Sequence, residues 1–189
     1  ERETMNILIL GGAGFVGTNL VRRCLKDPKN LVTVVDSLEP RLKSTTENLK
    51  GVWKQIRFVK ADIRNREAME RLVRGKDAIF NCAAQSSHTL SILDPFFDVS
   101  INCIGNLTLL EAVRRKNKRA LIIYPSSSTM IGKTRAPVDE TSAEAPLDIY
   151  SADKSVVEKY FRIYTRVHDL KTIVIRFANL FGPYGKGYP

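Results

Sequence analysis

The stretch Asn6-Ile-Leu-Ile-Leu-Gly-Gly-Ala-Gly-Phe-Val-Gly17 decides how this chain folds. Residues 6–10 are almost all apolar, as in a strand buried inside a parallel sheet. The turn that follows reads as G-x-x-G-x-x-G from Gly11 or as G-x-G-x-x-G from Gly12. Glycines permit a tight turn and a close backbone approach to a pyrophosphate, and a following helix offers N–H donors to the phosphates. The stretch therefore predicts a strand, a phosphate-binding turn and a helix.

Short apolar runs alternate with helical patterns along the rest of the chain. The predicted strands lie at residues 6–10, 31–35, 56–59, 77–82, 120–124 and 172–177, and the predicted helices at 15–26, 66–74, 98–116 and 151–168. Strand and helix in steady alternation are typical of an α/β fold with a doubly wound parallel sheet, the Rossmann fold. We expect one such domain over residues 1–189, with no internal repeat.

The composition agrees with one globular domain, since 43% of the 189 residues are hydrophobic and 26% are charged. No uninterrupted apolar run approaches the ~18 residues of a membrane span, and no basic and apolar leader precedes the first strand, so we expect a cytoplasmic protein without membrane contact. Cys24, Cys82 and Cys103 are widely spaced in apolar segments. They predict buried, reduced thiols, with neither disulfides nor a metal site.

The formal net charge of +10 raises the question of nucleic acid. The basic residues are scattered over predicted helices, and no recognised binding module or aromatic-interleaved stripe accompanies them. We therefore favour solvated helix faces over nucleic-acid binding. An anionic small ligand would benefit from the same field.

Two acidic positions follow predicted strands. Asp36 ends the second strand, about 20 residues after the glycine turn, where a carboxylate can accept hydrogen bonds from both ribose hydroxyls of a dinucleotide. A carboxylate there repels a 2′-phosphate, which favours NAD over NADP; the alternative is a helix-capping aspartate. Asp62-Ile63, just past the third strand, is placed to meet the adenine, with helix capping by Asp62 again the alternative.

Tyr150 and Lys154 put a phenol and an ammonium four residues apart, on one face of a helix. A lysine beside a tyrosine favours the phenolate, so that a group with a reference pKa of ~10 could exchange a proton nearer neutrality. The alternative is a solvated lysine beside a half-buried tyrosine.

The chain resembles the extended short-chain dehydrogenase/reductases of the NAD-dependent epimerase/dehydratase family over nearly its whole length. The family's motifs occur in order: the glycine turn, Asp36, Asp62-Ile63, Asn81-Cys-Ala-Ala-Gln85, Asn102 at the start of a long helix, Ser126-Ser-Ser128 after the fifth strand, Tyr150 with Lys154, Arg176-Phe-Ala-Asn179, and Phe181-Gly-Pro183.

The resemblance implies roles for individual residues. Ser127 would hydrogen-bond the reacting hydroxyl, Tyr150 would act as general acid and base, and Lys154 would bind the nicotinamide ribose and lower the tyrosine pKa. The implied NAD-binding residues are Gly11, Gly14, Phe15, Val16, Gly17, Asp36, Asp62, Ile63, Ala83, Ala84, Asn102, Tyr150, Lys154 and Phe177. The implied substrate-binding residues are Ser86, Ser127, Ser128 and Asn179. For Asn102, which would orient the catalytic loop, helix capping is the alternative.

The resemblance implies transient oxidation of a sugar hydroxyl to a keto-sugar, with hydride passing to NAD. Dehydratases of the family carry aspartate then glutamate after the catalytic serine or threonine, whereas Ser128 and Thr129 stand here. This favours a nucleotide-sugar epimerase resembling UDP-glucose 4-epimerase. Dehydratases, decarboxylases of UDP-glucuronate and 2-epimerases of CDP-sugars stay as alternatives within the family, and a non-catalytic NAD- or RNA-binding module as one outside it. His88 is interpreted as a loop histidine that could instead touch the sugar.

The sequence also departs from the family. Asp153 puts a negative charge beside Lys154, which would oppose the phenolate if the side chain turned inward. Family members continue for roughly another hundred residues, about one small domain, beyond the position of Pro183. We therefore expect the chain to be the cofactor half of the enzyme, without the C-terminal substrate domain, and to bind NAD while turning over nucleotide-sugars slowly. By analogy with relatives, we expect a homodimer.

Overall fold

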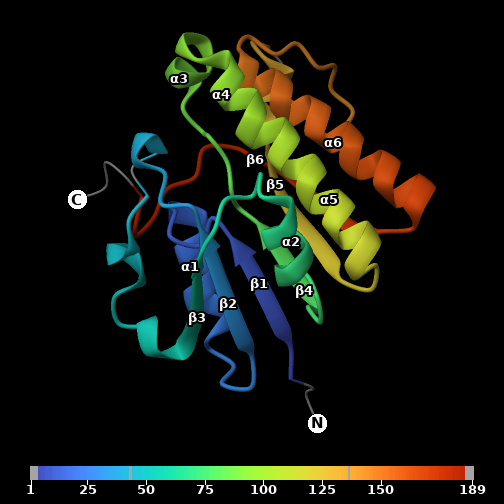
Figure 1. The fold of residues 1–189 in the computed structure, drawn as a ribbon. Coiled ribbons are helices and arrows are strands. Elements are labelled where there is room, and N and C mark those ends of the chain that lie inside the picture. The colour runs from blue at the N-terminus through green and yellow to red at the C-terminus, as the bar shows by residue number, and fades with distance from the viewer. Residues whose placement is uncertain (1–3, 43, 136, 186–189) are drawn as a thin grey trace.

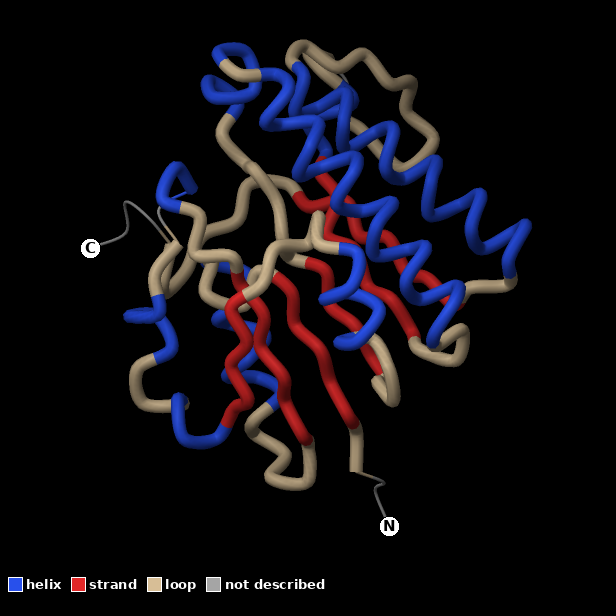
Figure 2. The backbone as a smooth tube through the Cα atoms, viewed as in Figure 1, coloured by secondary structure: helices blue, strands red, loops and turns tan. Residues whose placement is uncertain are grey.

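Six parallel strands form one sheet in the computed structural model, which describes residues 4–42, 44–135 and 137–185 (Figures 1 and 2). The strands run in the order β3-β2-β1-β4-β5-β6 across the sheet. Their bounds are β1 Asn6–Leu10, β2 Leu31–Asp36, β3 Ile56–Lys60, β4 Ala78–Asn81, β5 Leu121–Ser127 and β6 Lys171–Phe177. The predicted doubly wound α/β sheet is confirmed.

Strands β2 and β3 are added on one side of β1, and strands β4 to β6 are added on its other side. Strand β1 pairs with β2 on one side and with β4 on the other, so the connections that leave these strands diverge. In doubly wound sheets a crevice opens at this switch point, outside the carboxyl ends of the strands.

Helices pack on both faces of the sheet. The α-helices are α1 Phe15–Cys24, α2 Arg66–Leu72, α3 His88–Leu93, α4 Pro95–Val99, α5 Gly105–Lys116 and α6 Ile149–His168, with a π-helical turn η4 at Ser100–Ile104 and short 3₁₀ turns at Pro40–Leu42, Thr46–Leu49, Trp53–Gln55 and Ser128–Ile131. In Figure 1 the long helices α5 and α6 lie side by side over one face, together with α2.

Three details differ from the sequence-based expectation. The predicted helix 98–116 begins earlier, at Pro95, because the Asp94 carboxylate accepts from the Phe97 N–H and caps it. Strand β5 continues through Ser127, so Ser126 and Ser127 belong to the strand, and only Ser128 follows it. Helix α3 was not predicted; it is too short to show a helical period.

Alternating side chains of the sheet divide the interior into two cores. On β1, Leu8 and Leu10 join the core beneath α2, α5 and α6, whereas Ile7 and Ile9 join the core beneath α1. Because both faces are covered, the strands read as continuous apolar runs. The carboxyl ends of the strands are thereby held at fixed positions.

The helical segment Pro95–Lys116 is long and apolar enough to cross a membrane by length and composition alone. However, 67% of its most apolar stretch is buried inside the protein. This burial is that of a core helix packed on a sheet.

Helix α6 is fixed to β5 by the stacked rings of Phe161 and Tyr124, whose centroids are 4.8 Å apart. Phe161 is fully buried, so Phe161→Ala should lower the free energy of unfolding by about 3–5 kcal/mol. The matched control Arg162→Ala removes an exposed side chain on the same helix and should change it by less than about 0.5 kcal/mol. Denaturant unfolding of both variants measures the difference, and equal losses would contradict the packing described.

Candidate active site

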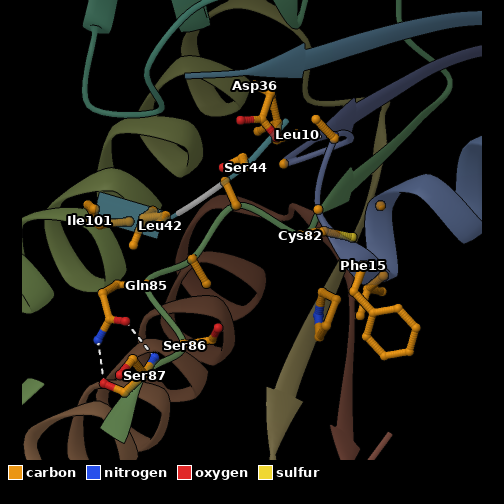
Figure 3. A pocket seen from close by; sticks show the side chains of 18 of the residues that line it. Leu10, Phe15, Asp36, Leu42, Ser44, Cys82, Gln85, Ser86, Ser87 and Ile101 are labelled. Atoms are coloured by element: carbon orange, nitrogen blue, oxygen red, sulfur yellow. Dashed lines mark hydrogen bonds between the residues drawn. The ribbon is translucent and has the colours of Figure 1, made fainter. Parts of the chain in front are cut away.

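A cleft of about 1230 Å³ opens at the carboxyl ends of the strands, at the predicted switch point. Figure 3 shows Asp36 and Ser44 at one end of it and Ser86 and Ser87 at the other, with Cys82 between them. The walls come from the glycine turn, the ends of β2, β4 and β5, helix α6 and the segment after β6. Residues far apart in the sequence therefore face one elongated cavity.

The glycine turn lies against the end of β4. Gly11 has a φ of +69°, and a Cβ added to it would lie 2.6 Å from the carbonyl of Cys82. A Cβ on Gly17 would lie 2.2 Å from the Gly11 oxygen. No side chain caps the first turn of α1 at Gly14, so the backbone donors of that turn are left to the cleft. Phe15 and Val16 also line the cleft. This turn fits a pyrophosphate.

Asp36 ties the end of β2 to the glycine turn. Its carboxylate accepts hydrogen bonds from the Ala13 N–H at 3.0 Å and the Leu38 N–H at 2.9 Å. Burial raises the pKa of Asp36, while these hydrogen bonds oppose the rise. Neither donor belongs to the first turn of a helix, so the capping alternative is wrong, and the carboxylate lines the cleft.

Other predicted cofactor residues lie along the same cleft. Asp62 pairs with Arg64 at 2.6 Å, and although burial raises the pKa of Asp62, the Arg64 hydrogen bonds hold it below its usual value. Helix α2 is capped by Asn65, not by Asp62. The remaining predicted residues that line the cleft are Ile63, Ala83, Ala84, Phe177, Ser86 and Asn179.

Ser127, Tyr150 and Lys154 all line the cleft. The Ser127 hydroxyl lies 2.9 Å from the Thr129 hydroxyl, and its interaction with Tyr150 opposes the rise that burial causes in the pKa of the phenol. The Lys154 ammonium is buried, donates to the Pro125 carbonyl at 2.9 Å, and lies 5.7 Å from the centre of the Tyr150 ring. The strand β5 and the helix α6 thus bring together three residues that the sequence separates.

The expectation that Lys154 lowers the pKa of Tyr150 needs correction for this arrangement. Burial raises the pKa of Tyr150, the Ser127 hydrogen bond lowers it, and the charges of Asp98 and Asp148 raise it further. Burial also disfavours the charged form of Lys154 and lowers its pKa to about 8. The ammonium bonds a backbone carbonyl and is not in hydrogen-bond contact with the phenol.

Two predicted site residues do not line the cleft. Asn102 is buried in the π-helical turn, where its amide accepts from the Gln85 N–H at 3.1 Å and donates to the Gln85 carbonyl at 3.0 Å. It therefore orients the loop by hydrogen bonds, as the family resemblance implied, from behind the cleft, and it neither lines the cleft nor caps a helix. Ser128 turns away at the start of a 3₁₀ turn, and its neighbour Thr129 lines the cleft instead.

His88 is better placed than its interpretation as a loop histidine suggested. Its Nδ1 lies 2.5 Å from an oxygen of Asp148, whose carboxylate also caps α6 by accepting from the Ser151 N–H. The His88 ring meets Tyr150 edge-on, with 4.9 Å between centroids. Only the fold brings residues 88 and 148 together, so a lone histidine in the sequence gave little signal.

The model of the NAD dependent epimerase/dehydratase family matches residues 7–189. The chain belongs to this family. Members are NAD-dependent by the family's own description, in agreement with the glycine turn and Asp36 on the cleft.

Similar family members catalyse different reactions. The chain is 34% identical to a CDP-paratose 2-epimerase of Salmonella typhi, over 94% of this chain and 58% of the relative. It is 33% identical to a dTDP-glucose 4,6-dehydratase of Mycobacterium tuberculosis, over 95% of this chain and 55% of the relative. Among solved structures, the UDP-glucose 4-epimerase of Thermus thermophilus in complex with NAD has a TM-score of 0.86 at 31% identity, covering 97% of this chain and 58% of that one. The chain thus spans little more than half the length of these relatives.

Burial of the Lys154 ammonium leads to a stability prediction. The pKa is depressed in the folded state, so the charge destabilises the fold in full below pH 8, and this penalty disappears as the pH rises from 8 to about 10.5. Lys154→Met should therefore raise the free energy of unfolding by about 1–3 kcal/mol at pH 7 and by progressively less above pH 8. Lys159→Met on the exposed side of α6 is the control. Denaturant unfolding at pH 7 and at a pH above 8 measures the difference between variant and wild type. Destabilisation by Lys154→Met at pH 7 would contradict the prediction.

Proposed function

We propose that the protein is an NAD-dependent nucleotide-sugar epimerase that acts on a sugar hydroxyl beside Tyr150. The supporting observation is the convergence of Ser127, Tyr150 and Lys154 at one end of a cleft that has the glycine turn and Asp36 at its other end. The family relationship supports an enzyme of the NAD-dependent epimerase/dehydratase type. The side chains around Ser127 favour epimerisation over loss of water.

The cleft fits a dinucleotide through its own residues. The first turn of α1 would hold the pyrophosphate, because no side chain caps its backbone donors at Gly14. Gly11 allows the turn to pack on the Cys82 carbonyl, and Gly17 allows α1 to pack on Gly11. Asp36 would accept from the adenosine ribose, and the small side chains of Ala83 and Ala84 leave space beside the turn. When bound, NAD would supply reversible acceptance of a hydride from the sugar carbon.

Proton transfer would fall to Tyr150. Its phenol and the Ser127 hydroxyl line the same cleft and interact with each other, so both oxygens are placed to contact one substrate hydroxyl. Because burial keeps the phenol protonated, the phenol is poised first as a donor, and taking a proton requires a nearby positive charge to offset burial. The Lys154 ammonium, one helical turn away, is the side chain that can supply this charge.

The residues around Ser127 favour epimerisation over loss of water. Elimination needs an acid and a base beside the sugar, which dehydratases are expected to supply directly after the catalytic residue. Here Ser128 and Thr129 stand in those positions, and Thr129 bonds Ser127. Among the described residues that line the cleft, the only carboxylates belong to Asp36 and Asp62, at the opposite end.

The reaction can be tested with a panel of UDP-, dTDP-, GDP- and CDP-sugars mixed with the chain and NAD+, with NADH formation followed in a single turnover and the sugar products identified. We expect one group of sugars to react and to yield the epimer. Tyr150→Phe should slow NADH formation by about 10²–10⁴-fold, because the general acid and base is lost. Tyr160→Phe, on the same helix, is the matched control and should react as the wild type does.

An unchanged rate in Tyr150→Phe would contradict the role of the phenol. If the product were a 6-deoxy-4-keto sugar, the reaction would be dehydration and the proposed epimerisation would be wrong.

Homodimerisation stays a prediction. The outer surface of η4 and α6 exposes apolar side chains, among them Ile104, Ile163 and Val167. We propose that a second copy of the chain covers this surface.

A further inference from the structure

Asp153, the residue that departs from the family beside Lys154, turns into the protein. It is 6% exposed, and it meets Asp98 of α4, which is fully buried. Helices α4 and α6 pack against each other, so two buried carboxyl groups from neighbouring helices interact, and one of them is adjacent in sequence to Lys154. Buried carboxyl groups in contact are costly unless a proton or a cation separates them.

The hydrogen bonds around the pair leave a place for one proton. One oxygen of Asp98 accepts from the side-chain amide of Gln85. The other, Oδ2, and Oδ2 of Asp153 are both buried without a hydrogen-bond partner among the described residues. A proton on Asp153 would convert one of these two unsatisfied acceptors into a donor that can satisfy the other.

The charged and titratable groups around the pair do not replace that proton. From α6, the Lys154 ammonium is bonded to Pro125, and Glu158 is paired with Arg176 at 2.8 Å. From η4, burial raises the pKa of the Cys103 thiol, and from β5 burial raises the pKa of Tyr124, so both are neutral. Burial likewise raises the pKa of Tyr150 and of Tyr160 on α6, so both phenols are neutral.

We propose that Asp98 and Asp153 share one proton, and that this protonated pair is a positioning element that holds the loop at Gln85–Ser87 against the catalytic helix α6. The loop is attached to Asp98 through the Gln85 amide, which also donates to the Ser87 carbonyl at 2.8 Å. Asp98 is attached through the proton to Asp153, which lies between Tyr150 and Lys154 in the sequence. Loss of the proton places two like charges in contact and loosens the loop from the helix.

The proton sharing does not depend on the proposed function, whereas its effect on turnover does. The direction of the Asp153 titration agrees with the geometry: burial, and next the hydrogen bond with Asp98, raise the pKa of Asp153 to about 7. A carboxyl group whose folded pKa is raised binds a proton that the unfolded chain has lost. Its contribution therefore makes the fold less stable as the pH rises from about 4 to about 7.

Unfolding by denaturant between pH 4 and pH 8 tests the pair without any need for turnover. Relative to Asp153→Asn, whose amide donates to Asp98 at every pH, the unfolding constant of the wild type should rise with pH, by as much as about a thousandfold across the range. Asp98→Asn should remove the same dependence. The control Asp139→Asn, in an exposed turn, should retain it.

Two measurements on the wild type keep the proposal testable if a variant folds poorly. The carboxyl ¹³C signal of Asp153 should titrate near pH 7, and the amide of Gln85 should be about tenfold less protected from hydrogen exchange at pH 8 than in Asp153→Asn. An Asp153 signal that titrates near pH 4, or equal pH dependence in wild type and both variants, would overturn the proposal. A titration near pH 7 in a protein that converts no nucleotide-sugar would uphold the shared proton and reject the proposed function alone.

Discussion

The cleft depends on one close contact, the approach of the glycine turn to the end of β4. A side chain at Gly11 would collide with the Cys82 carbonyl, and one at Gly17 with the Gly11 oxygen. Bare backbone at both positions lets α1 begin directly at the switch point of the sheet, where strand order reverses. The free first turn of α1, the Asp36 carboxylate and the small residues after β4 are consequently held around one cavity.

The part of that cavity around Tyr150 and Lys154 is built on polar groups removed from water, and each of them depends on a neighbour. Lys154 is bonded to a strand carbonyl, Asn102 to the backbone of Gln85, and the Gln85 side chain to Asp98. Buried polar groups are costly when they lack partners, so such a network fixes one arrangement of loop and helix. The same burial raises the pKa of Tyr150, so the site that orients the phenol also keeps it protonated.

The sequence predicted the sheet and most of the cleft because those features follow from local patterns. A few consecutive residues are enough to recognise an apolar run, the glycine turn or an acid at the end of β2. The missed features depend on pairing across the fold. Asn102 orients the Gln85 loop as expected, but it does so from inside a helical segment and not from a helix start. His88 meets Asp148 across 60 positions. The inward turn of Asp153 required a partner on α4 that no spacing rule connects to it.

The central claim is that this cleft binds NAD with Asp36 at the adenosine ribose. Calorimetric titration of the chain with NAD+ and with NADP+, in wild type and in Asp36→Ala, tests it most directly. The account predicts that the wild type binds NAD+ at least about tenfold more tightly than NADP+, since the carboxylate repels a 2′-phosphate, and that Asp36→Ala loses this preference. Equal affinity of the wild type for both dinucleotides, or no binding of NAD+, would contradict it.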